Sequence, residues 1–210
     1  DFLLKNGCNI HHIDNNENSI LLEAVLNGDY DVVKYLVDKG ADVCHTNKDG
    51  LCPALAAAQA CNSNLVELFV DKGCDFSFTD ENDRGLLEYA AAMKSPNLVD
   101  FLLSKGCNVN IEKAAFIAAS SGNVAILRSF VEKGIDPTVK SSNGSTLLHF
   151  AVLSNTIECV YAAFNAGCYI NECDNFGHSA LHLACQCSTP TIVRALIDEG
   201  IKISFANKKG

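Results

Sequence analysis

The chain has 210 residues, with 16 basic and 25 acidic side chains and a formal net charge of -9 at pH 7. This acidic balance repels a phosphate backbone and argues against a nucleic-acid-binding protein. The sequence contains no apolar run of about 18 residues or more and no basic-then-apolar start, which argues against a membrane span and a secretory signal.

The same local phrase recurs around seven glycines, from "KNGCNI" and "DKGADV" to "DEGIKI": Gly7, Gly40, Gly73, Gly106, Gly134, Gly167 and Gly200. Five of the six intervals are 33 residues and the fourth is 28. A 33-residue period indicates units of one turn and two helices that bury their apolar faces only by stacking. We therefore expect a single elongated array over residues 1–210 without a linker, cut through a repeat at both ends.

Each unit contains the same predicted elements in the same order. Val32, Val33, Leu36 and Val37 form the apolar stripe of a helix, as do Leu98, Val99, Leu102 and Leu103 further along the chain. The marker glycine ends each of these helices, because it adopts positive φ without steric cost, and Lys39, Lys72, Lys105 and Lys133 suit the helix carboxyl end.

Turn residues follow about ten positions after each marker glycine, in "NKDG", "SSNG" and "DNFG". A second helix then begins, with Thr146 or Ser179 as its N-cap.

These phrases resemble those of the ankyrin repeat family, whose T-P-L-H-x-A-A motif is matched by "TLLHFAV" at 146–152 and "SALHLAC" at 179–185, and more loosely by "CPALAAA" at 52–58. The resemblance implies an all-α solenoid of stacked helix-turn-helix units with short β-hairpin turns. This sequence departs from the pattern at Glu17 and Asp83, where a turn glycine is expected. It also departs where another residue replaces the motif histidine, at Leu22, Leu55, Glu88 and Phe116.

The 11 cysteines do not have the pattern of a disulfide framework. Cys8, Cys74, Cys107 and Cys168 follow marker glycines, at the place that Ala41 takes in the second unit, so we expect them to be small packing residues. The odd total of 11 cysteines in the chain favours reduced thiols and a cytoplasmic location. In that compartment the sequon at 143–145 would not be glycosylated.

One cluster has the residue types of a zinc site: His178, His182, Cys185 and Cys187. The competing interpretation is structural and is the one we favour. In the ankyrin motif the histidine at position 182 bonds backbone between repeats, and Cys185 takes an alanine position that faces the core. No P-loop, dinucleotide motif or nucleophile-base pair is found, so we expect no catalytic residues, no metal and no cofactor.

The family's usual activity is to bind another protein along the turn tips and the exposed side of the first helices. Transferring those positions to this chain gives a candidate surface, which we expect to bind a basic or mixed-charge segment of a partner. Its members are Thr46, Lys48, Asp49, Leu51 and Gln59 in the second unit; Thr79, Glu81, Arg84 and Met93 in the third; Lys140, Ser142, Asn143 and Ser145 in the fifth; and Asn175, Phe176, His178 and Gln186 in the sixth.

Two functions agree with these features. The first is a non-enzymatic scaffold or adaptor whose repeat surface is its function. The second is a recognition arm of a larger enzyme or membrane channel. Residues 1–210 do not separate them.

The fourth unit, "GCNVNIEKAAFIAASSGN", lacks five residues of its turn, so that only Ile111 and Glu112 are expected at its tip. Lys113 to Ala119 align with the family motif, and we expect Ala118 and Ala119 to pack in the core. Two explanations are open. The deletion is real and leaves a notch between the third and fifth tips, or five residues are absent from a chain that is numbered continuously.

Overall fold

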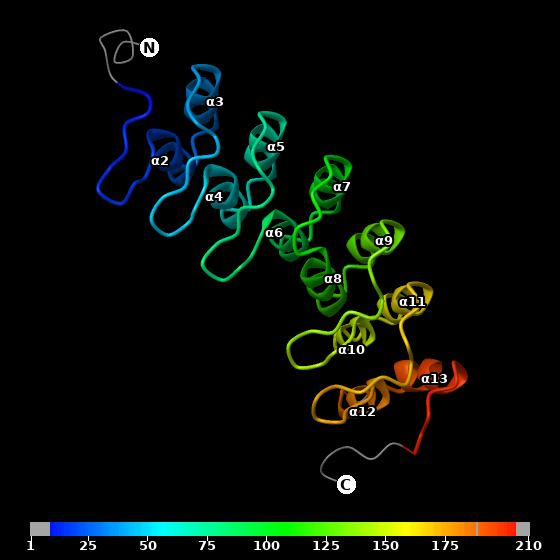
Figure 1. Cartoon of the computed structure of the whole chain (residues 1–210). Helices are drawn as coiled ribbons and strands as arrows, with labels where there is room; N and C mark the ends of the chain where they lie inside the picture. Colours follow the sequence, from blue (N-terminus) through cyan, green and yellow to red (C-terminus); the bar gives the residue numbers. More distant parts are fainter. Residues whose placement is uncertain (1–8, 188, 205–210) are drawn as a thin grey trace. The chain divides into compact units, whose positions relative to one another are not determined.

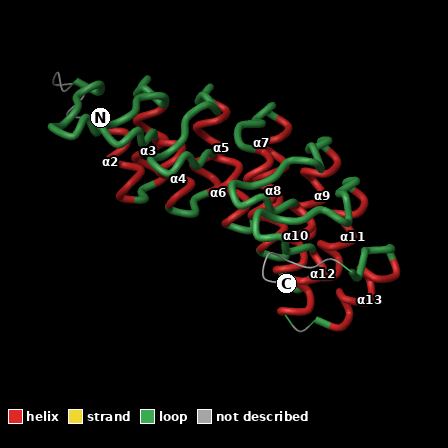
Figure 2. The backbone as a smooth tube through the Cα atoms, turned by 60° about the horizontal axis from the view of Figure 1, so that its bottom comes forward, coloured by secondary structure: helices red, strands yellow, loops and turns green. Residues whose placement is uncertain are grey.

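The computed structural model describes residues 9–187 and 189–204, which form twelve helices and no sheet (Figures 1 and 2). The predicted all-α class is thereby confirmed. The helices are α2 (Ile20–Asn27), α3 (Tyr30–Asp38), α4 (Pro53–Gln59), α5 (Ser63–Asp71), α6 (Leu86–Ala92), α7 (Pro96–Ser104), α8 (Ile111–Ser120), α9 (Val124–Glu132), α10 (Leu147–Leu153), α11 (Ile157–Asn165), α12 (Ala180–Gln186) and α13 (Pro190–Asp198).

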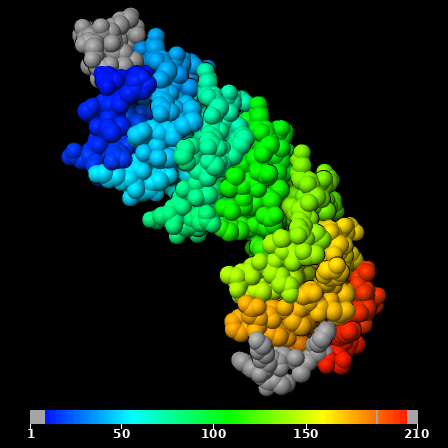
Figure 3. All heavy atoms as spheres, viewed as in Figure 1, coloured from blue at the N-terminus to red at the C-terminus, as the bar shows by residue number. Residues whose placement is uncertain are grey.

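The described residues divide into two compact units, one within 1–93 and 101–109 and the other within 94–100 and 110–210. Six helix pairs, α2/α3 to α12/α13, correspond to six repeats, and we call the even-numbered helices inner and the odd-numbered ones outer. In the first unit α4 packs between α2 and α6, and in the second unit α10 packs between α8 and α12. Figure 3 shows the repeats of each unit side by side in chain order.

The inner helices are short and rich in small residues, which lets neighbouring helices approach closely. Ala54, Ala56, Ala57 and Ala58 of α4 are all buried. In the shortened fourth repeat Ala118 and Ala119 of α8 are fully buried, as expected from the sequence. Such positions contribute to stability through close packing rather than through large side chains.

The outer helices begin at polar caps and end before a glycine. Asp29, Asn62 and Asn123 each accept a backbone N–H from the first turn of the helix that follows. The marker glycines from Gly40 to Gly200 have positive φ, which confirms their predicted role as helix terminators.

One residue of the predicted apolar stripes lies on the surface. Val32 is 45% exposed, whereas Leu65 and Leu98, at the equivalent place in the next two repeats, are buried. Helix α3 is the first outer helix among the described residues, and no described helix covers that side of it. Val32 is therefore not a core residue here.

The cysteines after the marker glycines are packing residues, as predicted. Cys74, Cys107 and Cys168 are buried like Ala41 in the equivalent place. Cys8 lies outside the described residues. The ten cysteines that are described are all free thiols.

Five repeats share one hairpin turn. Its first residue donates its backbone N–H to the carbonyl four residues later, as Asp14 does to Asn18 (3.0 Å) and Asp174 to His178 (2.9 Å). Antiparallel bridges join Ile13 to Ser19 and Cys173 to Ser179. These bonds account for the predicted short β-hairpin turns.

Neighbouring turns are bonded to each other within each unit. The backbone N–H of Lys48 donates to the carbonyl of Asn16 (3.2 Å) in the first unit. In the second unit the backbone N–H of Asn175 donates to the carbonyl of Asn143 (2.9 Å). The turns are thus fixed by backbone contacts between repeats as well as by their own bonds.

The full sequence is continuous from Asn110 to Ile111, so the fourth repeat has a true deletion, and Asn110 leads directly into α8. The carbonyl of Asn110 accepts the N–H of Ala114 (3.0 Å), which is the first bond of that helix. The expectation that Ile111 and Glu112 form a turn tip was wrong, because both residues are helical and α8 is ten residues long. An extra stretch of helix replaces the turn.

The turn glycine at position 144 is predicted to be the most sensitive of the turn residues. Gly144 has φ +79, and a Cβ there would lie 2.8 Å from the backbone nitrogen of Asn175 and in steric conflict with its Oδ1. Gly144→Ala should therefore cost about 2–4 kcal/mol of unfolding free energy, from left-handed strain plus the clash. Chemical denaturation measures this cost.

Gly50→Ala is the matched control. Gly50 has φ +74, but its added Cβ would meet only the carbonyl of Thr79 at an ordinary 3.8 Å. This variant should lose about 1–2 kcal/mol from strain alone. Equal losses in the two variants would contradict a close approach between the fifth and sixth turns.

Candidate functional site

Most of the predicted surface residues lie on the surface of the molecule. Lys48, Asp49, Gln59, Glu81, Arg84, Lys140, Ser142, Asn143, Asn175, Phe176 and Gln186 are exposed, and Thr46, Leu51, Thr79, Met93 and His178 are half-buried. Ser145 is only 5% exposed, because its backbone closes the fifth turn through bonds with Ser141. Burial therefore removes Ser145 from the candidate surface.

The first unit contains an acidic hollow of about 260 Å³ between the second and third turns. The hollow is lined by Asp49, Leu51, Gln59, Asp80, Glu81, Asn82 and Tyr89. Three carboxylates thus surround one apolar and one aromatic side chain. A cationic side chain with an apolar stem fits this combination, because the stem can contact Leu51 and Tyr89 while its charge faces the carboxylates.

Hydrogen bonds fix the floor of the acidic hollow. The Tyr89 hydroxyl donates to Asp80 Oδ2 (2.5 Å) and accepts from Gln59 Nε2 (3.1 Å). Partial burial opposes the charge on Asp80, but the bonds from Tyr89 and from the backbone N–H groups of Arg84 and Asn82 outweigh it and lower the pKa of Asp80. Asp80 is therefore ionised at neutral pH.

The sixth turn presents the most exposed aromatic residue of the candidate surface. Phe176 is 59% exposed, while Asp174 Oδ1 accepts the backbone N–H groups of Phe176 (2.9 Å) and His178 (2.8 Å) and fixes the turn beneath it. The ring of Phe176 lies 6.1 Å from that of His178. The Phe176 side chain is held outward by the turn and is not part of the core.

The shortened repeat lies next to a larger hollow in the second unit. This short-turn hollow of about 470 Å³ is lined by Asn110, Glu112, Lys113 and Phe116 and by residues 139–142 before and within the fifth turn. Phe116 takes the place of the motif histidine and stacks on Phe150, with ring centroids 4.8 Å apart. The missing turn leaves this part of the inner surface open.

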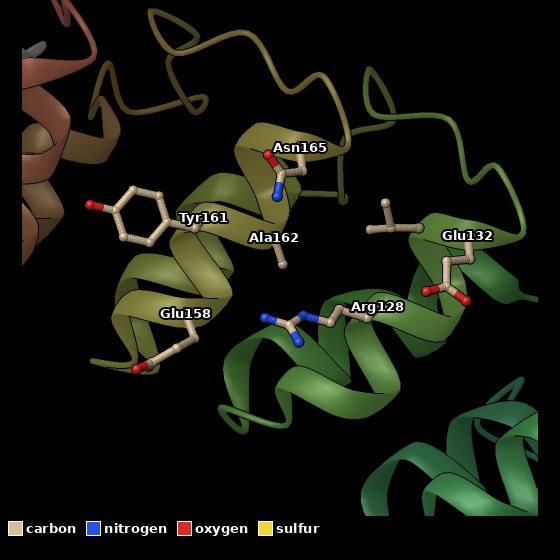
Figure 4. A pocket seen from close by; sticks show the side chains of 7 residues that line it. Arg128, Glu132, Glu158, Tyr161, Ala162 and Asn165 are labelled. Atoms are coloured by element: carbon tan, nitrogen blue, oxygen red, sulfur yellow. The ribbon is translucent and has the colours of Figure 1, made fainter.

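A third concave region lies between two outer helices of the second unit. The groove has a volume of about 290 Å³ and is lined by residues of α9 and α11, among them Arg128, Glu158 and Tyr161 (Figure 4). In Figure 4 the Arg128 side chain extends from α9 toward α11. This outer groove was not predicted from the sequence.

The motif histidines are used by the fold. His149 Nδ1 accepts the backbone N–H of Thr146 (3.1 Å), and its Nε2 lies 3.0 Å from the carbonyl of His178 in the next repeat. Glu88 replaces this histidine in the third repeat and accepts the N–H of Gly85 (2.6 Å). Leu22 and Leu55, which also replace it, are fully buried.

The four residues that were considered as zinc ligands do not converge on one point. His182 Nδ1 accepts the backbone N–H of Ser179 (3.2 Å), His178 Nδ1 lies 3.3 Å from Asp174 Oδ2, and Cys185 and Cys187 are exposed. Among the described residues no group of three or more His, Cys, Asp or Glu side chains is arranged to hold a metal ion.

Sequence reasoning missed the residues that complete the hollows. Tyr89 and Asp80 were not selected, although Tyr89 follows the motif position of Glu88 and so faces away from the core. Val139 and Lys113 of the short-turn hollow were also missed. The sequence signal for Lys113 was the shortened turn itself, which uncovers the start of α8.

Comparison with known proteins relates most of the chain to one family. The family model for ankyrin repeats (3 copies) matches residues 21–113 and 115–207. The ankyrin repeat domain of Bcl-3 superposes with a TM-score of 0.76 at 23% identity, covering 91% of this chain and 90% of that one. The ankyrin repeat domain of human ASB11 has a TM-score of 0.77 at 22% identity, covering 97% of this chain and 92% of that one.

Curated relatives are similar over shorter stretches. Protein phosphatase 1 regulatory subunit 27 of Mus musculus is 40% identical over 68 residues, which cover 32% of this chain and 44% of that protein. Ankyrin repeat and SOCS box protein 3 of Homo sapiens is 34% identical over 87 residues, which cover 40% of this chain and 17% of that protein. RelA-associated inhibitor of Mus musculus is 30% identical over 86 residues, which cover 41% of this chain and 10% of that protein. The matched stretch thus spans less than half of each relative.

In the described part of the chain, no helix has the length and apolar character needed to cross a bilayer.

The stability of the second unit should depend on pH through His149. Burial lowers the pKa of His149 from its ordinary 6.5, so the folded protein keeps this ring neutral while the unfolded chain protonates it. The stability that the fold gains from a neutral His149 is fully present above about pH 6.5. It is lost as the pH falls below that value. The unfolding free energy should therefore be lower at about pH 5.5 than at about pH 7.5, as measured by denaturant titration.

His149→Gln tests the assignment. This variant should lose about 1–3 kcal/mol at neutral pH, because the bond to the next repeat is weakened. Its stability should also change less between the two pH values. A slope identical to that of the parent protein would show that His149 is not the responsible group.

Proposed function

Because this chain belongs to the ankyrin repeat family, we propose that it is a non-enzymatic protein-protein interaction scaffold that binds its partner on the turn tips and inner helices. The observation that carries the proposal is the acidic hollow. Its carboxylates and Tyr89 lie on the side of the inner helices where the turns project, and the core does not use them. A site of this composition suits a basic side chain of a partner protein.

The distribution of charge supports a basic or mixed-charge docking segment. Acidic residues far outnumber basic ones before residue 94, whereas the two are nearly balanced after it. Asp49 and Glu81 are exposed at successive turn tips. Placing like charges close together costs free energy that a cationic partner would recover.

The roles of the relatives support binding rather than catalysis. One relative is a regulatory subunit of protein phosphatase 1, and another is an inhibitor associated with RelA. A regulatory subunit and an inhibitor both act on other proteins. We propose by analogy that this chain regulates or assembles other proteins, and that it does so in the cytoplasm, where its free thiols would stay reduced.

A second proposal is that the chain is the recognition arm of a larger enzyme or channel. The observation in its favour is that the matched stretches are small shares of the curated relatives, from 10% to 44%. The full-length sequence of the parent protein decides between the two proposals. A catalytic or pore signature in it would favour the second.

Binding at the acidic hollow should weaken as salt rises. Peptides selected from a random phage-displayed library on the immobilised chain should be enriched in Arg or Lys, with a Kd at least about tenfold higher at 500 mM than at 50 mM NaCl. Asp49→Asn with Glu81→Gln should weaken binding about fivefold at low salt. Fluorescence polarisation measures both effects.

Asp31→Asn, compared with the single variant Asp49→Asn, is the control for net charge. Asp31 lies in the first turn of outer helix α3, in the same unit but away from the hollow. An equal effect of Asp31→Asn would indicate a diffuse charge effect. Selected peptides without basic residues would argue against the acidic hollow as the site.

Phe176 is proposed as an aromatic anchor at the sixth turn. Phe176→Ala should weaken binding of a partner that reaches this turn by about 1–3 kcal/mol, because aromatic anchors carry much of an interface's energy. Tyr169→Ala is the matched control, since Tyr169 is also exposed (64%) but lies outside the hairpin turn. Unchanged affinity for Phe176→Ala would remove this residue from the site.

A further inference from the structure

One hairpin turn of the array is missing, and the place beside the fifth turn that it would occupy is open. Figure 1 shows a hairpin loop in front of inner helices α4, α6, α10 and α12, whereas α8 follows α7 without one. The short-turn hollow of about 470 Å³ is lined by the start of α8 and by the fifth turn. The contacts that complete turns make with each other therefore indicate what this hollow lacks.

In two pairs of neighbouring turns, the later turn donates hydrogen bonds to the earlier one. The backbone N–H of Lys48 donates to the carbonyl of Asn16 (3.2 Å), and the backbone N–H of Asn175 donates to the carbonyl of Asn143 (2.9 Å). The side chains of Lys48 and Asn175 donate to further carbonyls of the same two turns. Lys48 and Asn175 take the same place, which is the second residue of the turn. In both pairs this residue binds the backbone of the preceding turn.

Ser142 takes this place in the fifth turn, but the turn that would accept its bond is deleted. Among the residues that the structure describes, the backbone N–H groups at this place in the third and fifth turns, Glu81 and Ser142, have no hydrogen-bond partner. Each lies beside a hollow, Glu81 at the acidic hollow and Ser142 at the short-turn hollow. The fifth turn itself is closed, because Gly144 donates its N–H to the carbonyl of Ser141 (2.8 Å). A fixed turn thus presents an unused donor where its neighbour is missing.

Apolar side chains line the short-turn hollow next to this donor. Phe116 and Val139 are half-buried, and Phe116 is held by its stacking on α10. Around them stand Glu112, Lys113 and Lys140, so the hollow lacks the excess of carboxylates found in the acidic hollow. A neutral apolar side chain therefore suits the short-turn hollow better than a cationic one.

We propose that a loop of a partner protein occupies the short-turn hollow in place of the missing hairpin. A backbone carbonyl of that loop accepts the N–H of Ser142, and a neutral apolar side chain beside it packs on Phe116 and Val139. Main-chain bonds to an open edge supply affinity, and the side-chain pocket supplies selectivity. The inference rests on the proposed protein-binding function. It adds a second site, whose preference differs from that of the acidic hollow.

A variant that fills the hollow from within the chain tests the location. In this turn-filled variant, residues 111–113 are replaced by a second copy of residues 139–146, which restores the five missing residues. The copied segment ends with Thr146, the N-cap of α10, and so leads into a helix as it does in the fifth repeat. Hydrogen exchange of the amide at the original Ser142 should be at least about tenfold slower than in the parent chain.

Two point variants separate the backbone donor from the side chain. Ser142→Pro removes the N–H without breaking a bond, and the second residue of a turn closed by Gly144 and Ser141 suits the φ of proline. The carbonyl at position 142, which Asn175 Nδ2 binds, is kept. Ser142→Ala is the matched control, because it removes the hydroxyl and keeps the N–H. Both variants should melt within about 3 °C of the parent chain, as followed by circular dichroism.

Cyclic peptides displayed on phage are the binding probe. Peptides selected on the immobilised parent chain, after removal of those that bind the turn-filled variant, should carry apolar residues without enrichment in Arg or Lys. They should bind the turn-filled variant at least about tenfold more weakly than the parent. Ser142→Pro should weaken binding about three- to tenfold through loss of one hydrogen bond, and Ser142→Ala less than about twofold. Fluorescence polarisation measures these affinities.

Three results would overturn the proposal. The first is that no peptide distinguishes the parent chain from the turn-filled variant, and the second is that Ser142→Pro and Ser142→Ala have equal effects. The third is dimerisation of the parent chain that the turn-filled variant loses, as seen by analytical ultracentrifugation, because a second copy would then fill the hollow. Basic peptides that depend on Asp49 and Glu81 would still support the acidic hollow, so the two proposals fail separately.

Discussion

The close approach of neighbouring inner helices is the constraint on which the rest of each unit depends. A pair of helices this short cannot bury its own apolar face, so each repeat is stable only against its neighbours. Small residues such as Ala57, Ala90 and Ala118 make the approach possible, and all three are fully buried. A larger side chain at these places would separate the helices and uncover both faces.

The spacing of the inner helices also sets the distance between neighbouring turns. Because the inner helices lie close together, the backbone of one turn reaches that of the next, as in the bond from Asn175 to Asn143. The same spacing places Asp49 near Asp80 and Glu81 and creates the acidic hollow. The arrangement that stabilises the core thus concentrates negative charge at the tips, and a cationic partner would relieve that repulsion.

The fourth repeat shows that packing of the inner helices does not require the hairpin turn. Its buried alanines are kept, so its inner helix packs against α10 as in the other repeats of the unit. Its turn is replaced by helix, and Phe116 stacks on Phe150 at the position where His149 of the fifth repeat bonds to the next repeat. The core tolerates this change because stacking depends on the helix register and not on the projecting hairpin.

The sequence by itself determined the repeat, the helix order, the positive φ at the marker glycines and the burial of Cys74, Cys107 and Cys168. These features follow from local backbone preferences and from apolar positions at a fixed period, which one chain displays directly. Only the tertiary structure decided that Ser145 is buried, that Ile111 and Glu112 are helical and that Tyr89 bonds to Asp80 in the acidic hollow. Those outcomes depend on distances between separate segments of the chain, and the spacing of residue types does not encode them.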